Sequence, residues 1–161
     1  MTAEVTLREV LDGDLPVFFA DQSDPAAQTM AAFQGREYGP FMEHWRDNIL
    51  GDDTVEKRTI LFNGRVAGNI VSWLEGGNRQ VGYWIGREFW GQGVATRSLN
   101  QFLQLIDSRP LYAHVAKHNV GSIRVLEKCG FRLDGEAEVP SRRSGETVTE
   151  CSYVLDSVTT D

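Results

Sequence analysis

The sequence predicts a mixed α/β (α+β) fold in which strands dominate and helices are interleaved at four places. Alternating apolar segments separated by short Gly- and Asn-rich turns are typical of paired strands. The stretch 84–99 passes from an apolar strand through Gly91 and Gly93 into a segment with apolar residues at helical spacing. The 161 residues suit one domain spanning the whole chain, 1–161, with residues 157–161 expected as a loose tail.

The chain opens with a predicted strand and a predicted helix. Residues 5–10 alternate between apolar and polar side chains, which indicates a strand. Asp12 or Asp14 is expected to cap a helix that begins near Leu15, because a carboxylate can accept the unpaired N–H groups of a first turn. Pro16 fits that first turn because it has no N–H to satisfy.

Two further helices are expected before the main run of strands. Asp24 and Pro25 form a cap and a first helical position. Residues 35–40 are expected to break the chain, and residues 41–49 carry apolar side chains at helical spacing. Gly51 is expected to end that helix.

The middle of the chain predicts three strands in succession. Residues 55–62 and 66–74 flank Asn63-Gly64, a strong signal for a tight hairpin. Residues 75–78 turn the chain again, and residues 79–85 form the strand that leads into the Gly-rich turn.

The last third repeats the alternation of strand and helix. The expected elements are a helix over 95–106, a strand over 111–115, a helix that Asn119 caps and Gly130 ends, and closing strands over 131–139 and 147–155 around a polar loop at 141–146.

Gly91 and Gly93 at a strand-to-helix turn suggest an anion site. The first N–H groups of a helix have no internal partner and suit a phosphate. A plain connecting turn is the simpler interpretation. A Walker loop is disfavoured because no Gly-Lys-Ser/Thr is present, and a dinucleotide fingerprint because Thr96 replaces the third glycine. A coenzyme A pyrophosphate site is the remaining nucleotide interpretation.

Two blocks resemble the GNAT superfamily of acetyl-CoA-dependent N-acyltransferases. Trp90-Gly91-Gln92-Gly93-Val94-Ala95-Thr96 resembles its pyrophosphate loop, with Trp90 in place of the usual Arg or Gln. Residues 119–131, with Asn119, Ser122 and Glu127-Lys128-Cys129-Gly130-Phe131, resemble its second signature. The Trp-Gly-x-Gly form is similar to the branch of ribosomal-protein N-terminal acetyltransferases. The resemblance implies a mostly antiparallel sheet with about four helices, in which two parallel strands splay apart at the cofactor.

The resemblance also implies which residues bind acetyl-CoA, the expected acyl donor. Backbone groups at Trp84 and Ile85 would receive the pantetheine arm and the acetyl carbonyl, and the side chain of Asn119 would meet the same arm. Arg124 and Lys128 share one helix face, which is usually a solvated surface but near the nucleotide would meet a phosphate, and Arg87 is a similar candidate. The full set of expected cofactor-binding residues is Trp84, Ile85, Gly91, Gln92, Gly93, Val94, Ala95, Thr96, Asn119, Ser122 and Lys128.

The expected catalytic residues are Ser122 and His114. Leu126 stands where many relatives carry a tyrosine, so the resemblance moves assistance to the leaving thiolate onto Ser122 or onto water. Gln80 stands where relatives often carry a glutamate, and an amide cannot take a proton. His114 is the candidate base, since its ordinary pKa of ~6.5 suits the task. Glu75, Glu138 or an amine that arrives neutral are the alternatives.

The acceptor is weakly encoded. By resemblance, the segment between the first two strands walls the acceptor cleft, and it contains Glu37, Tyr38 and Trp45. Acidic and aromatic side chains suit a cationic amine, such as a protein N-terminus or a small-molecule amine, although such residues are equally common on ordinary surfaces.

Composition and charge exclude several classes of protein. A net charge of −7 argues against a nucleic-acid binder, and no apolar run reaches the ~20 residues of a membrane helix. Cys129 and Cys151 form no disulfide framework, and the start of the sequence lacks a signal peptide, so a cytoplasmic protein without a metal is expected. Monomer and homodimer are both left open.

The leading hypothesis is therefore an N-acetyltransferase. A non-catalytic acyl-CoA-binding or sensor domain is the alternative, and the residues that favour it are Gln80 and Leu126.

Overall fold

The computed structural model describes residues 3–141 and 146–156. The tail expected at 157–161 and the centre of the loop expected at 141–146 lie outside the described residues.

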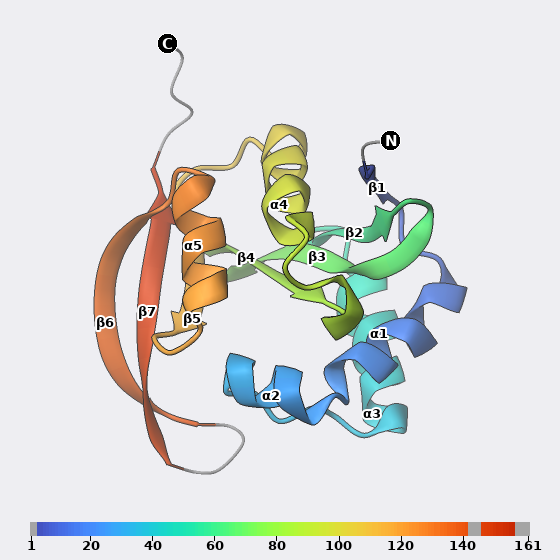
Figure 1. Cartoon of the computed structure of the whole chain (residues 1–161), viewed down its shortest axis with the longest axis horizontal. Coiled ribbons are helices and arrows are strands. Elements are labelled where there is room, and N and C mark those ends of the chain that lie inside the picture. Colours follow the sequence, from blue (N-terminus) through green and yellow to red (C-terminus); the bar gives the residue numbers. More distant parts are fainter. Residues whose placement is uncertain (1–2, 142–145, 157–161) are drawn as a thin grey trace.

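Within these ranges a seven-stranded sheet in the order β1-β2-β3-β4-β5-β7-β6 forms the centre of the molecule (Figure 1). Neighbouring strands are antiparallel, except that β4 and β5 are parallel. The predicted mixed, mostly antiparallel fold is confirmed. The strands are β1 (Val5–Arg8), β2 (Glu56–Phe62), β3 (Arg65–Glu75), β4 (Asn78–Ile85), β5 (Leu111–Ala116), β6 (Arg132–Pro140) and β7 (Thr147–Leu155).

Five α-helices lie in the described part of the chain, close to the expected number. They are α1 (Leu15–Gln22), α2 (Pro25–Ala31), α3 (Tyr38–Glu43), α4 (Val94–Leu105) and α5 (Val120–Lys128). A π-helical segment, His44–Leu50, continues α3, and short 3₁₀ turns occupy Asp12–Asp14 and Arg87–Phe89.

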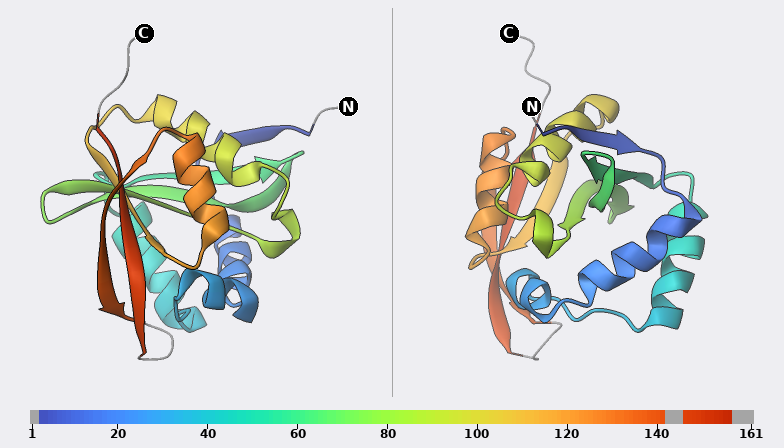
Figure 2. Two further views of the ribbon diagram at one scale, coloured as in Figure 1. Left: turned by 60° about the vertical axis from the view of Figure 1, so that its left-hand side comes forward. Right: turned by 45° about the vertical axis from the view of Figure 1, so that its right-hand side comes forward.

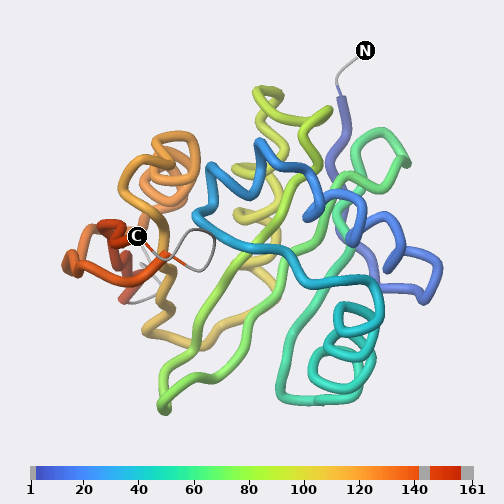
Figure 3. Tube along the Cα trace, turned by 90° about the horizontal axis from the view of Figure 1, so that it is seen from below, coloured from blue at the N-terminus to red at the C-terminus, as the bar shows by residue number. Residues whose placement is uncertain are grey.

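The helices cover both faces of the sheet (Figures 1 and 2). On one face α4 and α5 bury apolar residues such as Leu99 and Phe102 against the strands. On the other face α1, α3 and the π-helical segment bury a second cluster that includes Phe18 and Trp45. Figure 3, seen from this second side, shows α1 and α2 crossing the strands.

Local signals placed most turns correctly. Asn63 and Gly64 both have positive φ, 51° and 82°, as the tight β2–β3 hairpin requires. The Asp24 carboxylate accepts a hydrogen bond from the Ala26 N–H at 3.1 Å and caps α2 as expected. Gly51 ends the π-helical segment.

The expected break at 35–40 is too long. Helix α3 already begins at Tyr38, so Pro40 lies in its first turn, where a missing N–H leaves no intrahelical hydrogen bond unmade.

The expected cap by Asp12 or Asp14 is wrong, since neither side chain caps α1. Asp14 occupies the cap position, but its buried carboxylate accepts hydrogen bonds from Arg8 at 2.7 and 2.9 Å and from the Leu11 N–H at 2.9 Å. It also accepts one from the Thr59 hydroxyl at 2.7 Å. Asp14 therefore joins β1, β2 and the start of α1.

The parallel strands β4 and β5 pair over only two positions, Arg79 with Leu111 and Gln80 with Tyr112. Beyond that point β4 stays paired with β3 as far as Ile85, and β5 stays paired with β7 as far as Ala116. The two strands therefore separate toward the Gly-rich turn, which confirms the splayed geometry.

On the side away from this opening, Gly68 on β3 allows β4 to lie close to β3. A Cβ at Gly68 would overlap the carbonyl oxygen of Trp84, so the two strands can approach this closely only with glycine there.

Helix α4 is tied to the start of the chain. Arg97 Nη1 donates to the Ala3 carbonyl and Gln101 Nε2 donates to the Val5 carbonyl, each at 2.7 Å. These bonds fix the helix that follows the Gly-rich turn against β1.

Cys129 is half-buried and Cys151 is buried, and neither forms a disulfide. No helix in residues 3–141 or 146–156 has the length and hydropathy needed to cross a membrane. In the same ranges, no group of three or more His, Cys, Asp or Glu side chains is arranged to hold a metal ion.

Asp14 should make stability depend on acidic pH. Burial alone would raise the pKa of Asp14, but the hydrogen bonds from Arg8, Leu11 and Thr59 outweigh it and lower the pKa from 3.8 to about 2. A lowered folded-state pKa stabilises the fold above the unfolded value, and this contribution is lost as pH falls from 3.8 to about 2.

We expect Asp14→Asn to lower the free energy of unfolding by about 2 kcal/mol at pH 7, with a difference from wild type that shrinks below pH ~4. Urea denaturation at several pH values measures this. Asp12→Asn, which changes an exposed carboxylate two residues earlier, should leave stability unchanged. An equal loss at pH 7 and pH 2.5 would contradict the assignment.

Candidate functional site

The Gly-rich turn joins the end of β4 to the start of α4. Gly91 and Gly93 have φ of 75° and 76°, a left-handed conformation that other residues adopt at a cost. Gly93 is the N-cap of α4, and no side chain caps the helix there. The first N–H groups of α4 are therefore available to an anion.

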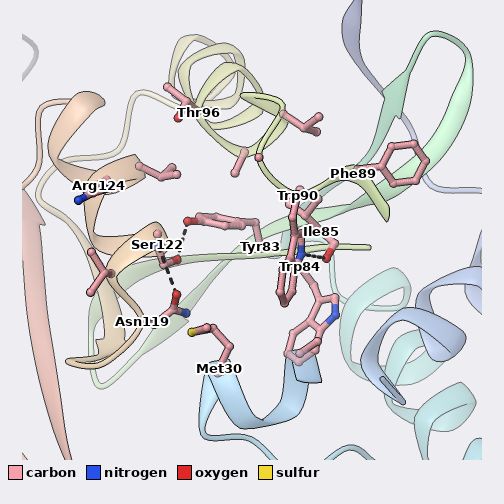
Figure 4. Close-up of a pocket in the computed structure, with 18 of the residues that line it drawn as sticks. Met30, Tyr83, Trp84, Ile85, Phe89, Trp90, Thr96, Asn119, Ser122 and Arg124 are labelled. Carbon is pink, nitrogen blue, oxygen red and sulfur yellow. Dashed lines mark hydrogen bonds between the residues drawn. The ribbon is translucent and has the colours of Figure 1, made fainter. Parts of the chain in front are cut away.

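A cavity of about 550 Å³ opens beside this turn (Figure 4). Its walls come from four parts of the fold: α2, the end of β4, the turn with the start of α4, and α5 with the residues just before it. The lining residues include Ala27 and Met30 from α2, Tyr83, Trp84 and Ile85 from β4, Gly91, Gly93, Val94, Ala95 and Thr96 from the turn and α4, and Asn119, Ser122, Arg124 and Lys128 from the α5 region.

The charge around this cavity favours an anion. Arg124 and Lys128 line it one helical turn apart, and none of the described lining residues is Asp or Glu. In a chain of net charge −7 this is a local reversal of sign. Arg87, the third expected cation, points elsewhere and pairs with Asp24 at 3.0 Å.

The structure brings together all but one of the expected cofactor-binding residues. Gln92 does not line the cavity, because its side chain is exposed and donates to the Glu88 carbonyl at 3.0 Å.

The end of β4 presents a different backbone from the one expected. Gly86 N–H donates to the Ala67 carbonyl of β3 at 2.8 Å, and backbone groups of successive strand residues point to alternate sides. Tyr83 and Ile85 therefore direct their backbone groups toward the opening, whereas Trp84 directs its own toward β3. The Ile85 carbonyl accepts a hydrogen bond from the Trp90 indole at 2.8 Å, which leaves the Ile85 N–H as a donor toward the opening.

A larger cavity of about 1270 Å³ lies on the other side of the β4–β5 opening. Its described lining residues include seven aromatic side chains, three carboxylates and the cation Arg36. The aromatic residues are Phe18, Phe33, Phe41, Trp45, Trp73, Tyr83 and Trp84, and the carboxylates are Asp52, Glu75 and Glu150.

The two cavities share part of their lining. Ala31, Tyr83, Trp84, Asn119 and Ser122 line both. Trp84 packs edge-on against Phe33 at 5.7 Å between ring centroids. This shared set, which we call the junction, lies where β4 and β5 have separated.

Hydrogen bonds fix the polar groups of the junction. Asn119 Oδ1 accepts from the Ser122 N–H at 3.3 Å, so Asn119 caps α5 as expected. The Tyr83 hydroxyl lies 2.6 Å from the Ser122 hydroxyl (Figure 4). Burial raises the pKa of Tyr83 to about 12, so the phenol stays protonated at neutral pH.

The candidate base His114 lines the larger cavity from β5. Its Nδ1 lies 3.1 Å from the Ser152 hydroxyl and 3.5 Å from Glu150 Oε1. Of the alternatives, Glu75 lines the same cavity, whereas Glu138 lines neither cavity and accepts from Thr149 at 2.6 Å. His44 also lines the larger cavity, and burial together with Arg36 lowers its pKa.

The expected acceptor residues are divided. Trp45 lines the larger cavity, but Glu37 and Tyr38 are exposed at the start of α3 and line neither cavity. Tyr38 packs its ring edge-on against Phe19 instead.

Three contributions escaped the sequence analysis: the hydroxyl of Tyr83, the wall formed by α2, and the carboxylate of Glu150 beside His114. The sequence could have predicted the position of the Tyr83 hydroxyl. Strand alternation places Tyr83 on the same face as Val81 and Ile85, and this brings a polar group to the side of the sheet that α4 and α5 cover. No sequence pattern could have predicted Met30 or Glu150, since their neighbours at the site are remote in sequence.

The comparisons with known proteins agree with this geometry. A sequence profile of the acetyltransferase (GNAT) domain matches residues 4–132. The protein MJ1062 of Methanocaldococcus jannaschii, described as uncharacterized, is 25% identical over 138 residues. That match covers 81% of this chain but 28% of MJ1062, so the chain spans less than a third of that relative.

Solved structures share the fold at low identity. The spermidine N-acetyltransferase from Vibrio cholerae, in complex with CoA and spermine, has a TM-score of 0.80 at 17% identity, with 94% of this chain and 95% of that chain covered. The RimL ribosomal L7/L12 α-N-protein acetyltransferase, in complex with coenzyme A, has a TM-score of 0.80 at 18% identity, with 95% and 94% covered. With the profile matching most of its length, this chain belongs to the GNAT family of acetyltransferases.

Proposed function

We propose that this protein transfers an acetyl group from acetyl-CoA to a primary amine by direct attack in a ternary complex. The observation that carries the proposal is the junction, where Tyr83, Trp84, Asn119 and Ser122 line both cavities. A thioester in the smaller cavity and an amine in the larger one would meet there. Direct transfer needs this proximity, because the two reactants must be held close and oriented.

The smaller cavity fits coenzyme A in three respects. The uncapped start of α4 offers N–H groups to a pyrophosphate, and Arg124 and Lys128 offer charge to a further phosphate. The splayed end of β4 offers the Ile85 N–H to an amide or carbonyl oxygen. The related structures from Vibrio cholerae and of RimL are complexes with coenzyme A, which supports the same donor here.

In the proposed reaction the amine nitrogen forms a bond to the acetyl carbonyl carbon, the carbon–sulfur bond breaks, and the electron pair passes to sulfur. Ser122 donates its hydroxyl proton toward that sulfur, which stabilises the leaving group. His114, on the acceptor side and beside Glu150, takes the proton that the amine loses, directly or through water.

The larger cavity suits an amine on an apolar body. Its aromatic walls would bury such a body, and Asp52, Glu75 and Glu150 would attract the ammonium group. We propose a peptide N-terminus or a small-molecule amine as acceptor. The relatives' substrates named above, spermidine and a ribosomal protein, share this amine chemistry.

An acyl-CoA-binding or sensor domain without catalysis is the alternative. Two side chains favour it: Gln80 is buried, lines neither cavity and cannot take a proton, and Leu126 lines the larger cavity without a hydroxyl.

An amine panel separates the two functions. We expect thiol release from acetyl-CoA in the presence of arylalkylamines, polyamines or peptides with a free N-terminus, with turnover of at least one class. The same peptides with a blocked N-terminus are the matched control and should give none. Tight binding of acetyl-CoA in calorimetry without turnover of any amine would support the sensor function instead.

Gly93→Val tests the donor site. A branched side chain at the start of α4 would stand where the pyrophosphate is proposed to bind, so acetyl-CoA affinity should fall at least ~10-fold. Gly64→Val is the control, because Gly64 has a similar φ of 82° in the β2–β3 turn, whose residues Asn63 and Gly64 line neither cavity. Both substitutions strain the backbone, since both glycines have positive φ. Calorimetry should show weaker binding only for Gly93→Val, and equal affinities in the two folded variants would dismiss the site.

Ser122→Ala tests assistance to the leaving group. The change removes one oxygen and little volume, so kcat should fall by about 10- to 100-fold while KM for acetyl-CoA stays within about twofold. Pre-steady-state transfer with the best amine measures this. A wild-type kcat would remove the hydroxyl from the mechanism and leave solvent as the proton donor.

A further inference from the structure

Two hydroxyl groups meet at the junction from different elements. Tyr83 comes from β4 and Ser122 from α5, 39 residues later in the chain, and their oxygens are 2.6 Å apart. In Figure 4 the Tyr83 ring extends from its strand toward α5, and its hydroxyl points at Ser122.

The chemistry of the two groups indicates which one donates. A phenol is a far stronger acid than an aliphatic hydroxyl, so it is the better hydrogen-bond donor of the pair. Burial, and to a smaller extent Cys129, raises the pKa of Tyr83 to about 12, although the hydrogen bond with Ser122 works in the opposite direction. Tyr83 therefore keeps its proton at neutral pH.

This direction decides where the Ser122 proton points. With Tyr83 donating to Ser122 Oγ, the hydrogen of Ser122 must face another acceptor. Among the described residues, Ser122 Oγ makes no hydrogen bond besides the one to Tyr83. Asn119 Oδ1 is engaged with the Ser122 N–H rather than with its hydroxyl. The Ser122 hydrogen is thus left for a group that enters the junction.

We propose that Tyr83 is a positioning residue for Ser122: its phenol donates to Ser122 Oγ and thereby presents the Ser122 proton to the sulfur of coenzyme A. The proposal rests on the donor site proposed above. Polarisation along such a chain strengthens the outer hydrogen bond, because each donor in a chain enhances the next. Ser122 would touch the sulfur, and Tyr83 would act only through Ser122.

Packing alone does not require the hydroxyl. The Tyr83 ring packs against the buried cluster under α4 and α5, and a phenylalanine would fill the same space. Tyr83→Phe therefore removes the donor with little change in volume. Tyr112→Phe is the matched control, because Tyr112 lies on neighbouring β5 and lines neither cavity.

The first test follows the thiol of bound coenzyme A, and it needs no acceptor amine. A hydrogen bond from Ser122 favours the thiolate, so it should lower the thiol pKa of bound coenzyme A. Ultraviolet titration of the thiolate at saturating protein should show a rise of about one pH unit in Tyr83→Phe and in Ser122→Ala. Tyr112→Phe should match wild type. A wild-type thiol pKa in Tyr83→Phe would overturn the proposal.

The second test is a double-mutant cycle on transfer. We expect Tyr83→Phe to lower kcat by about 10-fold with unchanged KM for acetyl-CoA, and the double variant with Ser122→Ala to be no slower than Ser122→Ala alone. Independent, multiplying losses would assign Tyr83 a structural role and contradict the proposal. If wild type transfers to no amine, the proposed function fails, and the thiol titration still decides the role of Tyr83.

Discussion

The separation of β4 from β5 is the constraint on which the site depends. Parallel strands would ordinarily continue to pair, but here each strand stays with its antiparallel neighbour, β3 or β7, and the central pairing ends after two positions. Gly68 contributes by letting β4 lie close against β3 at Trp84. The unpaired end of β4 then faces the opening, where Tyr83 and Trp84 line both cavities.

This opening joins two environments of different chemistry. One side has helix N–H groups and two cations without a carboxylate, and the other side has aromatic walls and three carboxylates. Under the proposed function, an anionic donor and a cationic acceptor would thereby be attracted to opposite ends of one passage. Between them, Asn119 accepts a hydrogen bond from the Ser122 N–H, and the Tyr83 hydroxyl lies 2.6 Å from the Ser122 hydroxyl, to which it is proposed to donate.

The sequence could predict features that depend on residues close together in the chain, and it failed for features that depend on distant ones. Gly91 with Gly93, the Asn63-Gly64 hairpin and the Asn119 cap act over a few residues, and the structure has all of them. Asp14 misled the prediction because its strongest partners, Arg8 and Thr59, lie on strands that a local cap rule ignores. Glu37 and Tyr38 were assigned by their place in the chain, whereas the cavity is also walled by residues that only the fold brings there, such as Glu150 from β7. The contact between the Tyr83 and Ser122 hydroxyls, from residues 39 apart in the chain, could be found only from the structure.

The hydrogen bonds from α4 to the first residues of the chain make the position of α4 depend on the folding of the whole domain. Arg97 and Gln101 are held by carbonyls 94 and 96 residues earlier in the chain, so the helix that begins the donor site rests on its most distant contacts in sequence. Closing so long a loop costs conformational entropy, which the packing of the whole domain has to offset. A fragment that keeps the Gly-rich turn but lacks the first strand would retain the motif without its support. The position of the first turn of α4 is therefore a property of the assembled fold, with the first strand in place.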